Sequence, residues 1–236
     1  MKDLSIIIPT KNEEKYLPRL LESIKNQTLK DYEIIVADAG SEDRTKQIAE
    51  SYKCKIVPGG HPSKGRNNGA DYSTGNVLAF IDSDIQLPNP NFLEKCMQEF
   101  GSRGLDVAGT YHEPIPSNTQ GKRIFDKIFY TIDNIGMRMA ENSKIPKMHM
   151  CMFATRDTHD EISGFREDLE FAEDADYSKR AVEQGKKFGI LKTPEHTLVS
   201  PRRLEKKRLK MALKYAWLNF RVWLGKEYKR GELKYF

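Results

Sequence analysis

The sequence predicts an α/β protein with a mostly parallel central sheet flanked by helices. Short apolar runs that suit buried strands alternate, in the first half of the chain, with segments whose apolar residues recur at helical spacing. The run Val77–Ile81 is the clearest strand, because five apolar residues lead directly into two carboxylates, Asp82 and Asp84. Ligands of such sheets bind at the carboxyl ends of the strands, so this pair indicates where the chemistry lies.

The first half of the chain alternates strand and helix throughout. The first strand ends at Pro9, and the next helix has Pro18 in its first turn, where proline is tolerated. Repeated strand–helix–strand units predict a parallel sheet covered on both faces. The expected elements are strands at 4–8, 32–37, 55–57 and 77–81 and helices at 17–27, 43–52 and 65–72.

The second half is less regular and ends in a basic amphipathic helix. We expect helices at 92–100, 122–139, 172–184 and 204–224 and strands at 107–111, 150–154 and 188–191. No linker, repeat or low-complexity tract separates these segments. The sequence therefore predicts one domain over residues 1–201 with a helical tail, 202–236, that belongs to the same unit. One stripe of the tail helix is apolar, and it comprises Leu209, Leu213, Trp217, Phe220 and Leu224.

Composition limits the class of protein. Of the 236 residues, 31% are charged and 38% are hydrophobic, and we find no apolar stretch of the ~18 residues that a membrane span needs. The apolar run that stops at Pro9 is too short for a secretory signal. Cys54, Cys96 and Cys151 are odd in number and far apart, which favours neither a disulfide framework nor a zinc site and suits a reducing cytoplasm.

Charge is distributed unevenly along the chain. The tail 202–236 holds twelve basic and three acidic residues, a net +9 that leaves the first 201 residues at −4. A basic tail favours an acidic partner such as nucleic acid, anionic lipid or a phosphorylated substrate. Its apolar stripe argues against nucleic acid. The stripe would either pack on the domain, the commoner outcome, or lie on an anionic membrane surface.

Polar loops follow the first four strands, at 9–14, 38–45, 59–69 and 82–86. Because the carboxyl ends of parallel strands share one edge of the sheet, these loops should surround one crevice. Their hydroxyls, amides and carboxylates suit a base, a ribose and a diphosphate, and Asp82 with Asp84 suits Mg²⁺ or Mn²⁺. Each loop alone also has a structural explanation, as a turn, a helix cap or a solvated acidic turn.

Taken together, the motifs resemble those of the family-2 glycosyltransferases with the GT-A fold. The similarity is dense from residue 4 to about 90 and again from 164 to 181. The segments that carry it are Pro9-Thr10-Lys11-Asn12-Glu13-Glu14, Asp38-Ala39-Gly40-Ser41-Glu42-Asp43-Arg44-Thr45, Gly65-Arg66-Asn67-Asn68-Gly69, Phe80-Ile81-Asp82-Ser83-Asp84 and Phe171-Ala172-Glu173-Asp174-Ala175-Asp176-Tyr177.

The resemblance implies an inverting, metal-dependent transferase that moves a hexosyl group from a nucleotide-diphosphate sugar. Asp38 would contact the base, Arg66 would lie near the base or ribose, and Asp82 and Asp84 would carry the metal and diphosphate. Gln86 resembles an extra metal ligand of polyprenyl-phosphate-sugar synthases, or else belongs to a polar surface turn. The expected substrate-binding residues are Pro9, Thr10, Glu13, Glu14, Asp38, Gly40, Lys64, Arg66, Asn67, Asp82, Ser83, Glu173, Arg202 and Arg203.

Asp174 is the expected general base. Inversion requires a carboxylate that accepts the acceptor's proton as the hydroxyl attacks, and Glu173-Asp174 matches the family's acidic pair. Like-charge repulsion within the cluster would raise one pKa, although acids also commonly decorate a helix N-terminus. His196 is either a further metal ligand or, more commonly for a lone histidine, structural. Arg202 and Arg203 would clamp a diphosphate, or simply begin a basic helix.

Alternatives from other classes remain. A sugar-nucleotide pyrophosphorylase would carry a glycine-rich basic loop after the first strand, where this chain has 9–14. A non-catalytic nucleotide-sugar-binding protein would not need Asp84 or Asp174. The acceptor would be a polyprenyl phosphate, a lipid-linked sugar or a soluble molecule. We expect a cytoplasmic enzyme, peripheral on the inner face of the cell membrane if the acceptor is lipid-linked.

Overall fold

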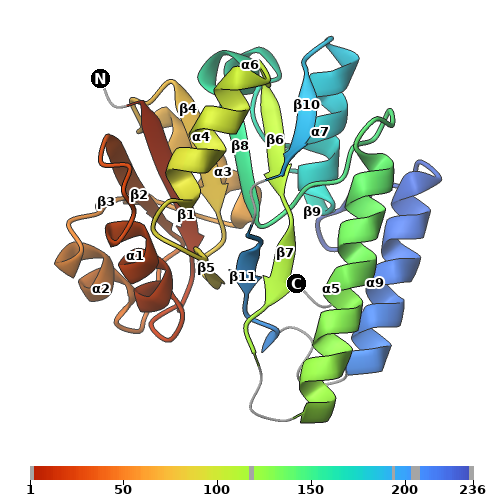
Figure 1. Ribbon diagram of the computed structural model, residues 1–236, viewed down its shortest axis with the longest axis horizontal. Helices are drawn as coiled ribbons and strands as arrows, with labels where there is room; N and C mark the ends of the chain where they lie inside the picture. The colour runs from red at the N-terminus through yellow and green to blue at the C-terminus, as the bar shows by residue number, and fades with distance from the viewer. Residues whose placement is uncertain (1–2, 117–119, 193–194, 203–207, 234–236) are drawn as a thin grey trace.

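The computed structural model describes residues 3–116, 120–192, 195–202 and 208–233. A seven-stranded sheet with helices on both faces forms its centre (Figure 1), in the order β10-β6-β8-β4-β1-β2-β3. These strands are β1 (Leu4–Thr10), β2 (Tyr32–Asp38), β3 (Lys55–Pro58), β4 (Val77–Ile81), β6 (Val107–Thr110), β8 (Cys151–Thr155) and β10 (Phe188–Leu191). The expected α/β architecture is confirmed.

The sheet is parallel except at β8. Strand β8 pairs antiparallel with β4 and with β6, whereas β1 pairs parallel with β2 and β4. The order β4-β1-β2-β3 follows from the strand–helix alternation of the first half. Its loops after β1 and β4 therefore meet at one edge of the sheet.

Alternation along each strand sends side chains to two separate cores. On β1, Ile6 and Ile8 face the core that covers one side of the sheet, while Ile7 faces the core on the other side. The first core is covered by α1 (Leu17–Lys25), α2 (Thr45–Ser51) and α4 (Phe92–Ser102), and the second by α3 (Pro62–Asp71) and α7 (Glu173–Glu183).

Helix α3 begins at Pro62, three residues before the expected start. His61 caps it by accepting a hydrogen bond from the Lys64 backbone at 3.3 Å, and proline occupies the first turn. The helix packs closely on β1, because a Cβ on Gly69 would lie 2.3 Å from Ile7 Cγ2. This close approach brings the first turns of α3 to the edge where β1 and β4 end.

Short strands complete the edge of the sheet beyond β4. Strands β5 (Ile85–Gln86), β11 (Thr197–Val199) and β7 (His112–Pro114) form a three-stranded sheet, and β12 (Tyr228–Lys229) pairs with β9 (Leu169–Phe171). The pairing of β11 with β5 brings the chain after β11 back to the end of β4. Helix α6 (Arg156–Glu161) follows β8.

Two longer helices, α5 (Gln120–Ala140) and α9 (Arg208–Trp223), run alongside each other in Figure 1. Helix α9 thus lies within the range 204–224 that was expected for the tail helix, and residues 203–207 are outside the described part of the chain. The preference for packing its apolar stripe against the domain is wrong. Leu213, Trp217 and Phe220 are all more than half exposed, because the opposite face, which includes buried Leu218, turns inward.

Among the described residues, no helix combines the length and the apolar character needed to cross a membrane.

Substitution Gly69→Ala should destabilise the fold. The added methyl group would overlap Ile7, a fully buried β-branched side chain, and overpacking of this kind costs about 1–3 kcal/mol. Gly101→Ala in α4 is the matched control, because a Cβ there meets nothing within 4 Å and alanine favours a helix by up to about 1 kcal/mol. Urea unfolding of both variants measures the difference. An unfolding midpoint for Gly69→Ala equal to that of the wild type would contradict the close packing of α3 on β1.

Candidate active site

A cavity of about 1290 Å³ opens where β1 and β4 end. It is lined by the loops after these strands, the start of α3, the start of α7 and the inner faces of α5 and α9. The expected site residues that line it are Pro9, Thr10, Glu13, Arg66, Asp82, Ser83, Asp84, Glu173, Asp174 and Arg202. Segments more than a hundred residues apart in the sequence thus meet in one place.

Arg66 connects the carboxylates that follow strand β4 to the start of α7. Its guanidinium is buried, at 4% exposure, and donates from Nη2 to Asp82 at 2.8 Å and from Nη1 to Glu173 at 2.9 Å. The guanidinium carbon of Arg66 lies over the ring of Phe165, 5.3 Å from the ring centroid. Burial alone would lower the pKa of Arg66, but the two carboxylates raise it, so the guanidinium stays charged. Among the described residues, its Nε has no hydrogen-bond partner.

Arg202 makes the equivalent link on the other side of the motif. The backbone amide of Ser200 donates to the Asp84 carbonyl oxygen at 3.1 Å, which fixes the chain after β11 beside β4. Arg202 then donates from Nε to Asp84 at 2.8 Å and from both Nη atoms to Glu13 at 2.7 and 2.8 Å. It lies over the ring of Tyr16, 4.3 Å from the centroid.

The loop after β2 is organised by Asp38, which does not line the cavity. Its carboxylate accepts hydrogen bonds from Thr10 at 3.2 Å, the Ser41 hydroxyl at 2.5 Å and the Gly40 amide at 3.1 Å. Burial would raise the pKa of Asp38, but the bonds from Ser41 and the charge of Lys46 lower it. Gly40 has φ +75°, which a glycine adopts without strain. Asp38 therefore holds its own loop in place.

Other expected residues also lie away from the cavity lining. Asn67 uses its amide to bind the segment after α6, donating to the Phe165 carbonyl at 2.9 Å and accepting from the Phe165 amide at 2.8 Å. His196 lies 3.3 Å from Glu113, four residues before Ser200, the residue that contacts Asp84. The expected residues outside the lining are Glu14, Asp38, Gly40, Lys64, Asn67, Gln86 and His196, and Arg203 lies outside the described residues.

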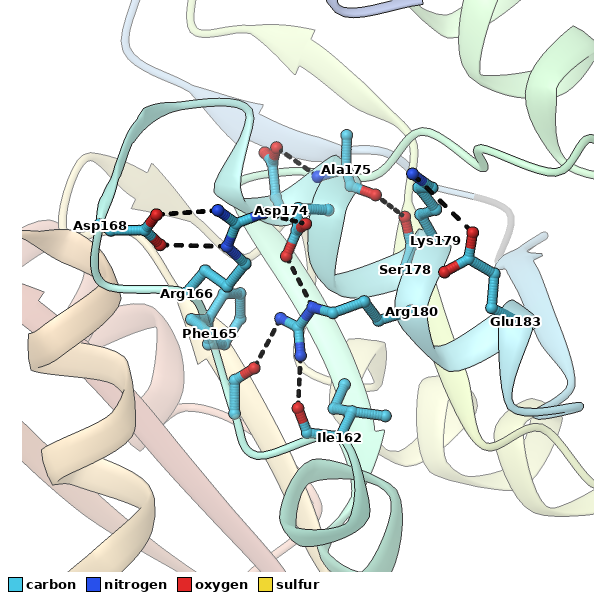
Figure 2. A network of polar contacts seen from close by, with 12 residues as sticks. Ile162, Phe165, Arg166, Asp168, Asp174, Ala175, Ser178, Lys179, Arg180 and Glu183 are labelled. Atoms are coloured by element: carbon cyan, nitrogen blue, oxygen red, sulfur yellow. Dashed lines mark hydrogen bonds and ion pairs between the residues drawn. The ribbon is translucent and has the colours of Figure 1, made fainter. Parts of the chain in front are cut away.

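Asp174 enters the cavity from the first turn of α7. The residue before the helix, Ala172, has φ +61°, a left-handed conformation that is uncommon for alanine and turns the chain sharply into the helix. Asp174 accepts a hydrogen bond from the Ala175 amide at 2.8 Å (Figure 2). Burial and the charge of Glu173 raise the pKa of Asp174 to about 6.

The acids beside Asp174 are paired with cations. Glu173 binds Arg66, and Asp176 lies 2.7 Å from Arg180 and 3.5 Å from Arg166. Arg180 also donates to the carbonyl oxygens of Ile162 and Gly164, so that ion pair is part of the packing of α7 (Figure 2). Within the described residues, Asp174 has no salt-bridge partner. It is thus the carboxylate of this turn that is available to accept a proton.

Sequence reasoning missed the other end of the cavity. There Asp133 of α5 binds Lys147 at 2.5 Å and His149 at 2.7 Å, and His149 stacks on buried His112 with 4.9 Å between the ring centroids. The local signal was Lys147 and His149, two basic residues just before β8. Their partner on α5 is set by the fold alone. The side chains of α5 and α9 that line this end are Phe129, Tyr130, Asp133, Met211, Tyr215 and Asn219.

A divalent cation fits the pair that follows β4. Asp82 and Asp84 both line the cavity and offer carboxylate oxygens, which suit Mg²⁺ or Mn²⁺ when water and phosphate complete the shell. Within the described residues, no group of three or more His, Cys, Asp or Glu side chains is arranged to hold a metal. The role of Gln86 and His196 as further metal ligands stays a prediction.

The chain belongs to glycosyl transferase family 2. The profile of that family matches residues 5–166, which include the cavity-lining residues from β1, α3 and β4. The resemblance inferred from the motifs is confirmed, and so is the GT-A fold.

Known relatives show how far the similarity extends. The chain is 35% identical over 123 residues to 4,4'-diaponeurosporenoate glycosyltransferase of Staphylococcus haemolyticus, covering 47% of this chain and 32% of the relative. It is 26% identical over 195 residues to glycosyltransferase AglE of Haloferax volcanii, covering 77% of this chain and 62% of the relative. The chain thus spans from about a third to about three-fifths of the length of these relatives.

Among solved structures, the mannosyltransferase PcManGT of Pyrobaculum calidifontis, in complex with GDP-Man and Mn²⁺, superimposes with a TM-score of 0.67. The match covers 92% of this chain and 59% of that one at 15% identity. At this identity the structural match supports the fold alone.

Substitution Glu173→Gln should lower the pKa of Asp174 from about 6 toward the ordinary range of aspartate. The change removes the nearest like charge and leaves the burial of Asp174 unchanged. Carbon-13 NMR of aspartate carboxyl groups, with Asp174→Asn to assign the resonance, follows the titration. Glu183→Gln, at the far end of the same helix, is the control. An unchanged Asp174 titration in Glu173→Gln would show that the two carboxylates do not interact.

Proposed function

We propose that the protein is an inverting, metal-dependent glycosyltransferase that transfers a sugar from a nucleotide-diphosphate sugar to an acceptor hydroxyl or phosphate. The observation that carries this proposal is the contrast within one cavity between paired and unpaired acids. Asp82 and Asp84 are held by arginines at one end, while Asp174 has a raised pKa and no salt-bridge partner among the described residues. Family membership supports the reaction class.

The donor's diphosphate would bind at the end of β4. Arg66 and Arg202 concentrate positive charge there, and the unpartnered Nε of Arg66 offers a further donor to a phosphate oxygen. Asp82 and Asp84 would hold Mg²⁺ or Mn²⁺, which supplies positive charge to the departing diphosphate. The nucleoside would lie toward Pro9 and Thr10 of β1, which line the same cavity.

Asp174 would perform the proton transfer. Its carboxylate takes the proton of the acceptor hydroxyl while that oxygen attacks C1 of the sugar, and the bond from C1 to the diphosphate oxygen breaks with its electron pair. Attack from the face opposite the diphosphate inverts the configuration at C1. Arg66 holds Glu173 beside Asp174, where burial and the charge of Glu173 raise the pKa of Asp174 while the charge of Arg66 lowers it.

The acceptor would occupy the end of the cavity between α5 and α9. Its lining combines aromatic and apolar side chains, such as Phe129 and Met211, with Lys147 and His149. This mixture suits an acceptor that joins an apolar part to a hydroxyl or phosphate. A soluble sugar acceptor would use the polar part of the lining only.

We expect nucleotide sugars to be hydrolysed slowly in the presence of Mn²⁺ and far more slowly in EDTA, because water replaces the acceptor. A panel of UDP- and GDP-sugars, assayed for free sugar, identifies the donor.

Asp84→Ala should abolish the metal dependence and weaken calorimetric binding of the matching nucleoside diphosphate, since it removes one of the two carboxylate ligands. Glu42→Ala, an exposed acid outside the cavity, is the control. Unchanged affinity and metal dependence in Asp84→Ala would refute the assignment.

Asp174→Asn should lower turnover by ~10²–10⁴-fold while donor affinity stays nearly constant, because a general base acts mainly in the transition state. In the wild type, activity should rise as the pH increases through about 6, since Asp174 must lose its proton to act. Steady-state rates between pH 5 and 8 measure both effects, with Glu183→Gln as the control. Near-normal turnover in Asp174→Asn would move the role to Glu173.

A further inference from the structure

Exposed apolar side chains are concentrated on two helices. Nine of the ten large hydrophobic residues that are exposed in the described chain belong to α5 or to α9 and the residue after it. Single exposed apolar residues are ordinary on a protein surface, but a contiguous group marks an interaction site. The remaining one, Tyr72, lies at the end of α3.

On α5 the exposed residues form one continuous stripe. They recur every three or four positions over four turns, so they share one face of the helix. The residues and their exposed fractions are Ile124 55%, Ile128 55%, Ile132 64%, Ile135 53% and Met139 80%. The opposite face, with Phe129, Tyr130 and Asp133, lines the cavity.

Helix α9 repeats the arrangement. Leu213, Trp217, Phe220 and Leu224 are 62%, 54%, 56% and 60% exposed and follow helical spacing. Met211, Tyr215 and Asn219, on the opposite side, line the same cavity as the inner face of α5. Both stripes therefore point away from the cavity, and the two helices lie alongside each other at one edge of the molecule in Figure 1.

The exposed charges on the two helices have one sign. Every exposed charged side chain described on α5 and α9 is basic, and these are Lys122, Arg123, Lys127, Arg138, Lys210 and Arg221. The acids of α5 are withdrawn from this face: Asp126 is 1% exposed, and Asp133 is bound to Lys147 and His149. Arg221 lies over the ring of Trp217 at 5.3 Å.

We propose that the stripes of α5 and α9 form a docking platform for an anionic lipid bilayer. Apolar side chains at the centre would enter the boundary between headgroups and acyl chains, and the basic residues beside them would contact the anionic headgroups. Trp217 with Arg221 is an amphipathic pair of the kind that favours this boundary. A protein partner with an apolar face would not by itself require a surround of one charge, whereas an anionic bilayer matches it.

Docking would bring a lipid-linked acceptor within reach of the cavity. The inner faces of the two helices line the acceptor end of the cavity, so that end would lie about one helix diameter, ~10 Å, from the membrane surface. A phosphate or sugar carried on a membrane lipid could then reach Lys147, His149 and Asp174. This consequence rests on the proposed transfer function, whereas docking itself does not.

Flotation of the full chain tests the proposal, with vesicles of phosphatidylcholine alone and with added phosphatidylglycerol. We expect binding to the anionic vesicles at low salt and weaker binding in 0.5 M NaCl, where charges are screened. Ile132→Asn combined with Trp217→Asn should reduce the bound fraction at least tenfold. Lys127→Glu combined with Lys210→Glu should weaken binding by about fivefold or more for each charge.

Matched controls lie elsewhere on the surface. Tyr72→Asn removes the exposed apolar residue of α3, and Lys25→Glu with Lys30→Glu reverses two exposed charges at the end of α1, so both should bind vesicles as the wild type does. Thermal unfolding of each variant confirms the fold. Absence of wild-type binding to anionic vesicles at low salt would overturn the proposal. So would a lipid-free dimer that Ile132→Asn with Trp217→Asn dissociates, since a second copy would then cover the platform.

The two hypotheses fail separately. Hydrolysis of the nucleotide sugar in solution needs no membrane, so the platform variants should retain it. Asp174→Asn should lose turnover yet float with the vesicles. Flotation without hydrolysis would refute the transfer function alone, and hydrolysis without flotation would refute docking alone.

Discussion

Charge neutralisation by two arginines is the interaction on which the rest of this site depends. Four carboxylates converge where β1, β4 and α7 meet, and they are Glu13, Asp82, Asp84 and Glu173. Left unpaired in a partly buried place, such charges would repel one another and resist desolvation. Arg66 and Arg202 each bridge two of them. Because these bridges join segments distant in sequence, they hold the loops of the cavity together as well as balancing its charge.

Much of the fold could be predicted because its signals are local. Buried parallel strands appear as short apolar runs, and the acids that end β4 mark the functional edge of the sheet. The direction of β8 could not be predicted, because an apolar run of five residues carries no information on which neighbour it pairs with or in which sense. The start of α3 was placed late, because its signal was the cap at His61 and Pro62 rather than an apolar period.

The residues of the site likewise divide into those that the sequence could predict and those that depend on the tertiary structure. Arg66, Asp82 and Asp174 follow strands or begin helices, and motif spacing predicted their convergence. Asp38 accepts hydrogen bonds from its own loop, as short polar residues next to a turn commonly do, and its expected contact with the base stays a prediction. Pairing of Asp133 with Lys147 required the packing of α5. Likewise, helical spacing predicted which residues of the tail share a face, yet only the tertiary structure shows that this face is exposed.

The start of α7 illustrates how function is set against stability. The neighbouring acids Glu173 and Asp176 are paired with arginines, and burial together with the charge of Glu173 raises the pKa of Asp174 to about 6. That pKa lies above the ordinary value for aspartate, so the folded state binds the proton of Asp174 more tightly than the unfolded state does. The resulting stabilisation is complete when the pH is below the ordinary aspartate pKa, and it is lost as the pH rises through about 6. At neutral pH the ionised group therefore costs about 1.4 kcal/mol for each pKa unit. A cation beside Asp174 would remove that cost, but it would also lower the basicity that proton transfer requires. Among the described residues, the missing salt bridge is thus the feature that favours Asp174 over Asp176 for the proposed role of base.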